Sequence, residues 1–253
     1  MPQPLSKFIK PGEPWAMAID AEEIPKKPAL AVLIAETVAK ASAMEHGMAM
    51  ILVHLLHASP EPAFAMFSEV MDAGNKRSMI LAAARAALPA EDFEAFEAIS
   101  SAYRTQMDVR NKFAHWLWGS CDQVDDALVL VDPRYMLKHR RNHQQVWNSD
   151  EDLSVAAAER HERRMAAMSY DFDKIYVYRK ADFDNVLRDL DETIQMINLI
   201  GFILDPSVAN LDERLREAFP DHESGASTAR QTLSSLRLFS EALTRLRNAR
   251  QKS

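Results

Sequence analysis

The sequence predicts a mainly α-helical protein, an antiparallel helical bundle with a small two-stranded β-ribbon and a helical C-terminal appendage. Ala-, Leu-, Glu- and Arg-rich stretches dominate the 253 residues and only 6 residues are Gly, which favours helix. Apolar residues recur at helical spacing over long stretches, whereas only two short stretches have the pattern of strands. With 47% hydrophobic and 26% charged residues, the chain can bury a core as one domain with an appendage, or as two small domains.

Composition also bounds the location and the partners of the chain. A single cysteine, Cys121, cannot form an intrachain disulfide, and the N-terminus lacks the pattern of a secretory signal, so we expect a cytoplasmic protein. The most apolar predicted helix carries Glu36, Lys40 and Glu45, which a membrane span would not tolerate cheaply, so we expect no membrane segment. A net charge of −7 argues against coating of nucleic acid by bulk electrostatics, so any nucleic-acid contact must be local.

The chain is predicted to begin with an extended arm, residues 1–28, whose six prolines forbid a continuous helix. Apolar residues at helical spacing then predict a first long helix from Pro28 to about Ser59. Residues 61–88 are predicted to form one or two shorter helices, broken near Gly74-Asn75.

A long central helix is predicted from Glu91 to Gly119. Glu91 and Asp92 occupy its first turn, where the helix dipole favours negative charge, and glycine is a common residue at a helix end. Arg110 interrupts the apolar stripe of this helix, so its charge requires a partner.

The strand patterns follow this helix. Residues 127–131 are a β-branched run and residues 174–178 alternate between apolar and polar side chains, which predicts a two-stranded ribbon. The polar insertion between them, about 134–172, is too long for a structureless loop. We expect it to contain a helix starting at Ser149, which forms a capping-box pattern with Asp152.

A strongly amphipathic helix from Phe183 to about Leu204 is predicted to complete a helical domain over residues 29–204.

The C-terminal appendage, residues 205–253, is predicted to pack on this domain or on a second subunit. It contains a short helix near Leu211 to Phe219, a breaker region at 220–227 and a basic amphipathic helix from Ala229.

The segment Arg110 to Trp118 carries the sharpest functional signal. On a helix, Asn111, His115 and Trp118 are neighbours at i, i+4 and i+7, and Arg110 lies about 140° around the axis from His115. The negative end of the helix dipole favours a protonated His115, which suits a proton donor or acceptor. Arg110 offers a charged fork suited to a phosphodiester, so the pair has the groups needed to cleave RNA without a metal.

The spacing Arg-x4-His alone is at chance level, since a second match runs from Arg134 to His139. The longer string is more specific: Asn after the Arg, Ala before the His, Trp three residues after the His, and then Gly. This string resembles the motif of the HEPN superfamily, and Ala43-Met44-Glu45-His46 looks like the acidic position of many bacterial members. The resemblance covers roughly residues 29–204. One departure is Trp116, where related sequences often have a small residue.

The resemblance implies a HEPN-like helical bundle, without cofactor or metal, that acts as an endoribonuclease of toxin–antitoxin or antiviral type. It implies a homodimer whose motifs meet at a cleft, with RNA as the substrate and an antitoxin protein as a possible partner. Arg110 and His115 would be catalytic, and Asn111, Glu45 and Trp118 would support them.

A second interpretation stays open, in which the chain is a non-catalytic helical binding or dimerisation module. Arg110 and Glu45 would then form a buried structural ion pair. Glu45 either orients or neutralises Arg110, and both roles predict contact between them. Trp116 and Trp118 either stack on a base or pack in the core or a dimer interface, and we favour packing.

Other polar clusters are weaker candidates. Four basic residues are candidate RNA contacts, although a solvated charged loop is the interpretation we prefer; they are Arg134, Lys138, Arg140 and Arg141. Two histidine pairs have metal-like spacing, His54 with His57 and His139 with His143, but no carboxylate or thiolate nearby in sequence completes a site, so we expect no metal.

Overall fold

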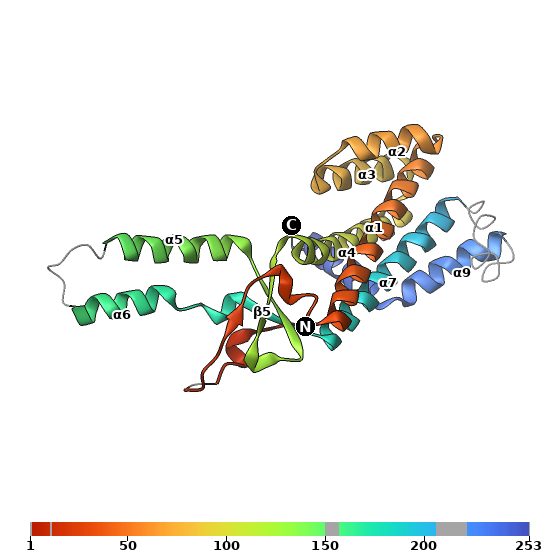
Figure 1. Ribbon diagram of the computed structural model, residues 1–253. Helices are drawn as coiled ribbons and strands as arrows, with labels where there is room; N and C mark the ends of the chain where they lie inside the picture. The colour runs from red at the N-terminus through yellow and green to blue at the C-terminus, as the bar shows by residue number, and fades with distance from the viewer. Residues whose placement is uncertain (1, 11, 150–156, 206–221, 253) are drawn as a thin grey trace. The chain divides into compact units, whose positions relative to one another are not determined.

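The structure is a computed structural model that describes residues 2–10, 12–149, 157–205 and 222–252 (Figure 1). It is mainly helical, as the composition predicts. The longer helices are α1 (Pro28–Leu56), α2 (Pro60–Glu69), α3 (Ala73–Ala87), α4 (Ala90–His115), α5 (Pro133–Ser149), α6 (Ala157–Met168), α7 (Lys180–Leu204), α9 (His222–Ser235) and α10 (Arg237–Arg250). The strands are β1 (Gln3–Pro4), β2 (Met17–Ala18), β3 (Leu117–Cys121), β4 (Ala127–Val131) and β5 (Ile175–Arg179), and the short 3-10 turns are η1 (Leu5–Lys7), η2 (Ala21–Glu23), η3 (Asp122–Val124) and η4 (Phe172–Lys174).

The chain divides into two compact units. Unit 1 comprises Met1–Glu36 and Asn111–Asn185, and unit 2 comprises Thr37–Arg110 and Val186–Ser253. The boundaries between the units fall within α1, α4 and α7. They do not follow the domain limits at 28/29 and 204/205, which stay a prediction. In the part of the chain that the structure describes, no helix is both long and apolar enough to cross a membrane.

Unit 1 is built on an antiparallel sheet of five strands in the order β1-β5-β4-β3-β2. The predicted ribbon is its centre, where β4 and β5 pair from Ala127 opposite Arg179 to Val131 opposite Ile175. The expectation of only two strands was wrong because the sheet recruits distant segments. The N-terminal arm supplies β1, which pairs with β5, and β2, which pairs with β3.

Strand β4 is buried along its whole length, so the sheet has a core on both faces. On one face Val129, Val131 and Val177 pack in a cluster with Leu5 of the arm. On the other face Leu128 stands opposite Tyr178 and Leu130 stands opposite Trp118 in the strand register. Because Leu5 is fully buried, this part of the arm belongs to the core.

The predicted polar insertion is a pair of helices, α5 and α6, which run side by side (Figure 1). The helix start predicted at Ser149 was wrong, since Ser149 is the last residue of α5. A capping-box pattern is also found by chance where polar residues are frequent, as they are here. Asp152, the other half of the pattern, lies outside the described residues.

Unit 2 holds most of α1, α4 and α7 together with α2, α3, α9 and α10. Helices α1 and α7 meet at Gly47, where an added Cβ atom would lie 2.7 Å from Cγ2 of Ile197. The break predicted near Gly74-Asn75 lies a few residues earlier. The Asp72 side chain accepts a hydrogen bond of 2.8 Å from the Asn75 N–H, so these residues begin α3 instead of interrupting a helix.

The C-terminal segment of unit 2 differs from its prediction in two ways. Helix α9 begins at His222, inside the predicted breaker region, and the predicted single helix from Ala229 is two helices that break at Leu236. The helix predicted at 211–219 lies outside the described residues. Both α9 and α10 contact α4: Arg230 forms an ion pair with Asp92 at 3.2 Å, and Arg247 with Glu94 at 2.7 Å.

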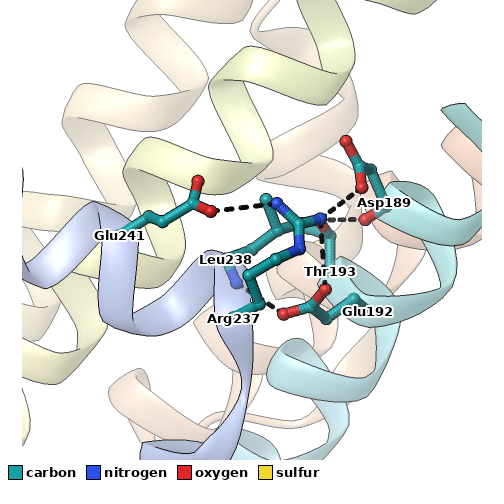
Figure 2. Close-up of polar contacts among 6 residues, drawn as sticks. All are labelled: Asp189, Glu192, Thr193, Arg237, Leu238 and Glu241. Atoms are coloured by element: carbon teal, nitrogen blue, oxygen red, sulfur yellow. Dashed lines mark hydrogen bonds and ion pairs between the residues drawn. The ribbon is translucent and has the colours of Figure 1, made fainter. Parts of the chain in front are cut away.

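Helix α10 starts against α7 in a cluster of charged residues (Figure 2). Leu236, the residue that precedes α10, makes no side-chain cap, and Glu192 of α7 instead accepts a hydrogen bond from the Leu238 N–H in the first turn. Arg237 bridges Asp189, Glu192 and, at 3.1 Å, Glu241. The carboxylate of Glu192 therefore satisfies a helix N–H group at the end where negative charge is favoured.

This arrangement predicts that Glu192→Ala lowers the free energy of unfolding by about 0.5–2 kcal/mol, the usual cost of removing a helix cap. Glu241→Ala is the matched control, because Glu241 contacts the same Arg237 through an exposed i,i+4 pair worth about 0.3–0.5 kcal/mol. Urea denaturation measures both values, and amide exchange in the first turn of α10 should accelerate only in Glu192→Ala. Equal losses in the two variants would contradict the cap.

Candidate functional site

The motif helix α4 ends at His115, four residues before the predicted stop at Gly119. The Trp116 N–H donates the last helical hydrogen bond to the Lys112 carbonyl at 2.8 Å. The Trp118 indole Nε1–H then donates to the Phe113 carbonyl at 2.9 Å, one of the final carbonyls of the helix that lack an intrahelical donor. The side chain of a strand residue thus provides the hydrogen bond that this carbonyl at the helix end would otherwise lack.

An aromatic cluster fixes this end. The Phe113 ring packs edge-on against Trp118, Tyr178 and Phe183, with ring centroids 5.3, 5.1 and 5.4 Å away. All four side chains are buried. The expectation that Trp118 lies beside Asn111 and His115 on one helix face was therefore wrong, since Trp118 belongs to β3 and packs in the core.

Gly119 has a different role from the one predicted. It lies in β3, and an added Cβ atom would approach the Ala18 carbonyl oxygen to 2.1 Å. Only glycine lets β2 of the arm lie this close to β3. The residue that looked like a helix stop is required by a long-range strand contact.

His115 is exposed as the last residue of α4, at the negative end of the helix. Its neighbour Trp116 is half-buried, with its ring 6.1 Å from the Tyr176 ring and the Lys112 Nζ atom 5.4 Å from its centroid. Trp116 therefore packs on its own unit and leaves the His115 imidazole accessible. Asn111, one turn earlier, is half-buried.

In unit 2, Arg110 and Glu45 act on the same buried phenol. Burial raises the pKa of Tyr103 far above its usual value, the nearby Glu45 carboxylate raises it further, and Arg110 lowers it. Glu45 bonds to the Lys76 ammonium at 2.6 Å, with its side chain 37% exposed. Arg110 is also half-buried. Glu45 and Arg110 therefore both lie near Tyr103, and the contact expected between the two stays a prediction. Neither side chain is fully buried, unlike the buried ion pair of the second interpretation.

Lys76 and Tyr103 are members of this group that the sequence did not single out. Lys76 follows a helix break and Tyr103 lies on an apolar stripe, so neither has a local pattern that distinguishes it from a surface lysine or a core tyrosine. Only the folding of α3 and α4 against α1 brings them to Glu45.

The basic run lies on a helix. Its four candidate residues are all exposed on α5, and the expectation of a charged loop was wrong because the run forms regular helical turns. They are Arg134, Lys138, Arg140 and Arg141. Among the described residues, no three His, Cys, Asp or Glu side chains gather as a metal site. His54 does have a carboxylate beside it, Asp205, 3.1 Å from its Nδ1 atom.

Comparisons of the chain with protein-family models, with curated proteins and with solved structures gave no match.

The helix end predicts the effect of Trp118→Phe, which keeps an aromatic ring in the cluster but removes the donor to the Phe113 carbonyl. We expect the free energy of unfolding to fall by about 1–3 kcal/mol, the cost of leaving a buried polar group unpaired. Trp147→Phe, at a site 51% exposed, is the control and should change it by no more than about 0.5 kcal/mol. Urea denaturation followed by circular dichroism measures both, and equal effects would show that the indole bond contributes nothing.

Proposed function

We propose that this protein is a HEPN-like, metal-independent endoribonuclease in which Arg110 and His115 act on an RNA phosphodiester. The observation that carries the proposal is the exposed imidazole of His115 at the C-terminal residue of α4. Arg110 lies five residues earlier on the same helix and is partly accessible. A general acid–base group and a fixed positive charge are the two groups that this chemistry needs.

In the proposed reaction His115 takes the proton from a ribose 2′-hydroxyl, and the 2′-oxygen attacks the adjacent phosphorus. The bond from phosphorus to the 5′-oxygen breaks, and a protonated imidazole returns a proton to that oxygen. The products are a 2′,3′-cyclic phosphate and a 5′-hydroxyl end. Arg110 stabilises the negative charge that builds on the phosphate oxygens, through a bidentate contact that its planar fork allows.

We infer the partners from the resemblance of the motif to that of the HEPN superfamily. The proposed active form is a homodimer in which two copies of the motif meet, so that one imidazole accepts a proton while the other donates one. A role in a toxin–antitoxin or antiviral system, with an antitoxin that silences the enzyme, belongs to the proposal. The cytoplasm is the expected location for such an activity.

The alternative is a non-catalytic binding or dimerisation module in which Glu45 and Arg110 hold the fold. Glu45 and Arg110 both lie near the buried Tyr103, which favours a contribution of the two side chains to the stability of the fold. Against a purely structural pair stand the exposure of Glu45 and its bond to Lys76, because a half-exposed ion pair contributes about 0–1 kcal/mol.

The catalytic claim predicts that His115→Asn abolishes cleavage of a mixed RNA pool in EDTA by the purified chain. His57→Asn is the matched control, since His57 is also an exposed histidine at a helix end and its positive φ of 49° suits asparagine. Gel analysis of RNA ends over time measures both. Cleavage that persists in His115→Asn, or absence of cleavage by the wild-type chain, would refute the claim.

Substitutions of Arg110 distinguish the catalytic function from the structural alternative. In the catalytic account, Arg110→Gln reduces cleavage by about 100-fold or more, while thermal unfolding stays within a few degrees of wild type. Arg110→Lys keeps the charge but loses the fork, so it recovers only part of the rate. A purely structural Arg110 predicts the reverse, with a marked loss of melting temperature in Arg110→Gln that Arg110→Lys largely restores.

A further inference from the structure

Planar side chains occupy every fourth position along one face of α5. They are Tyr135, His139, His143 and Trp147, and residues four apart on a helix lie above one another. The rings of Tyr135 and His139 are 6.2 Å apart and nearly parallel, at 30°. Those of His143 and Trp147 are 5.5 Å apart. The helix therefore presents two pairs of rings in one row.

Contacts from outside α5 hold this row in place. The Tyr170 ring stacks on His139, with centroids 4.4 Å apart and an interplanar angle of 24°. The Asp171 N–H donates a hydrogen bond of 2.6 Å to the Tyr135 hydroxyl oxygen, which fixes the segment that carries Tyr170. At the far end, the Arg164 guanidinium of α6 lies 4.4 Å from the Trp147 ring centroid.

A pocket of about 570 Å³ opens beside these rings, entirely within unit 1. The rings of His139, His143 and Tyr170 form part of its wall, and Met136 and Met168 add apolar surface. Arg140 and Gln144 supply hydrogen-bond donors. The volume falls in the range of small-ligand sites, and a wall that combines flat apolar surface with a few donors suits a ligand with both a ring and an anionic group.

The helices beside the pocket carry more basic than acidic residues, which favours an anionic ligand. Helix α5 carries Arg and Lys but no acidic residue, although the whole chain has a net charge of −7. Helix α6 adds three arginines against two glutamates. The acids Asp150, Glu151 and Asp152 belong to the connection, outside the described residues. Among the residues that the structure describes, none of those that line the pocket is acidic.

His139 adds a neutral polar group to this wall. Burial lowers the pKa of His139 below its usual value, and the neighbouring His143 lowers it further. The imidazole is therefore mainly uncharged at neutral pH, with one nitrogen that donates and one that accepts a hydrogen bond. Such a group matches the edge of a nucleobase better than it matches a simple anion.

We propose that this pocket binds a nucleoside phosphate unit, with the base stacked on the Tyr170 ring, its edge at the His139 imidazole and the phosphate at Arg140. Stacking platforms beside a positively charged track are the usual means of holding single-stranded nucleic acid. The same unit occurs in a free nucleotide and in an RNA strand, and the row of rings and cations along α5 offers room for further units of a strand. This binding does not depend on cleavage at His115.

The test measures the dissociation constant of a fluorescein-labelled oligouridylate of about twelve nucleotides by anisotropy, with 2′-O-methyl groups that prevent cleavage. Tyr170→Leu should raise the dissociation constant about 5- to 150-fold, since one stacked base is lost, and Tyr170→Phe should restore most of the affinity. Arg140→Gln should weaken binding and reduce the salt slope by about 1. Arg245→Gln on α10, an exposed arginine outside the pocket, is the control and should bind as wild type.

Calorimetry with uridine and adenosine 5′-monophosphates distinguishes the two sources. If the strand binds more tightly than either nucleotide, the ligand is RNA. If they bind equally, the pocket is a site for a free nucleotide. Both results support the proposal. Failure of the wild-type chain to bind any of them, or unchanged binding in folded Tyr170→Leu and Arg140→Gln, overturns it. His115→Asn tests cleavage and Tyr170→Leu tests binding of the free nucleotides, so loss of cleavage and loss of binding are separable.

Discussion

The hydrogen bond from the Trp118 indole to the Phe113 carbonyl is the constraint on which the candidate site depends. It draws the chain out of α4 and into β3, and the aromatic rings of Phe113, Tyr178 and Phe183 then enclose the indole. His115 is left as the last helical residue, exposed, with no following turn to cover it. A longer helix would continue past His115 and move its negative end away from the imidazole.

The opposite end of α4 is held by charge instead of by rings. Asp92 and Glu94 bond to arginines of α9 and α10, and those helices are themselves anchored at the Glu192 cap on α7. Exposed ion pairs contribute little free energy individually. The buried apolar residues of α9 and α10, such as Leu233 and Phe239, therefore contribute most of the free energy that holds these helices in place.

Local patterns predicted the elements whose own residues bury a face. Helices α1 and α7 follow apolar stripes, β4 is a β-branched run and β5 has an alternating pattern, so their types and limits were close to those observed. The patterns failed where distant segments decide. Gly119 was assigned to a helix end because glycine ends many helices, but its role is set by Ala18, about a hundred residues away. In the candidate site, the sequence pattern singled out Arg110, Asn111 and His115. It could not predict the group around Tyr103 or the pocket beside α5, because packing between distant segments forms both.

The chemistry of the cleaved RNA ends tests the central claim most directly. Acid–base cleavage at His115 uses the neighbouring 2′-hydroxyl as nucleophile, whereas a metal-activated water leaves a phosphate on the 5′ end. Mass spectrometry of a defined oligoribonucleotide after incubation with the purified chain in EDTA distinguishes these products. The account predicts fragments that end in 2′,3′-cyclic phosphate and begin with 5′-hydroxyl. Fragments with 3′-hydroxyl and 5′-phosphate ends, or an intact oligonucleotide, would contradict it.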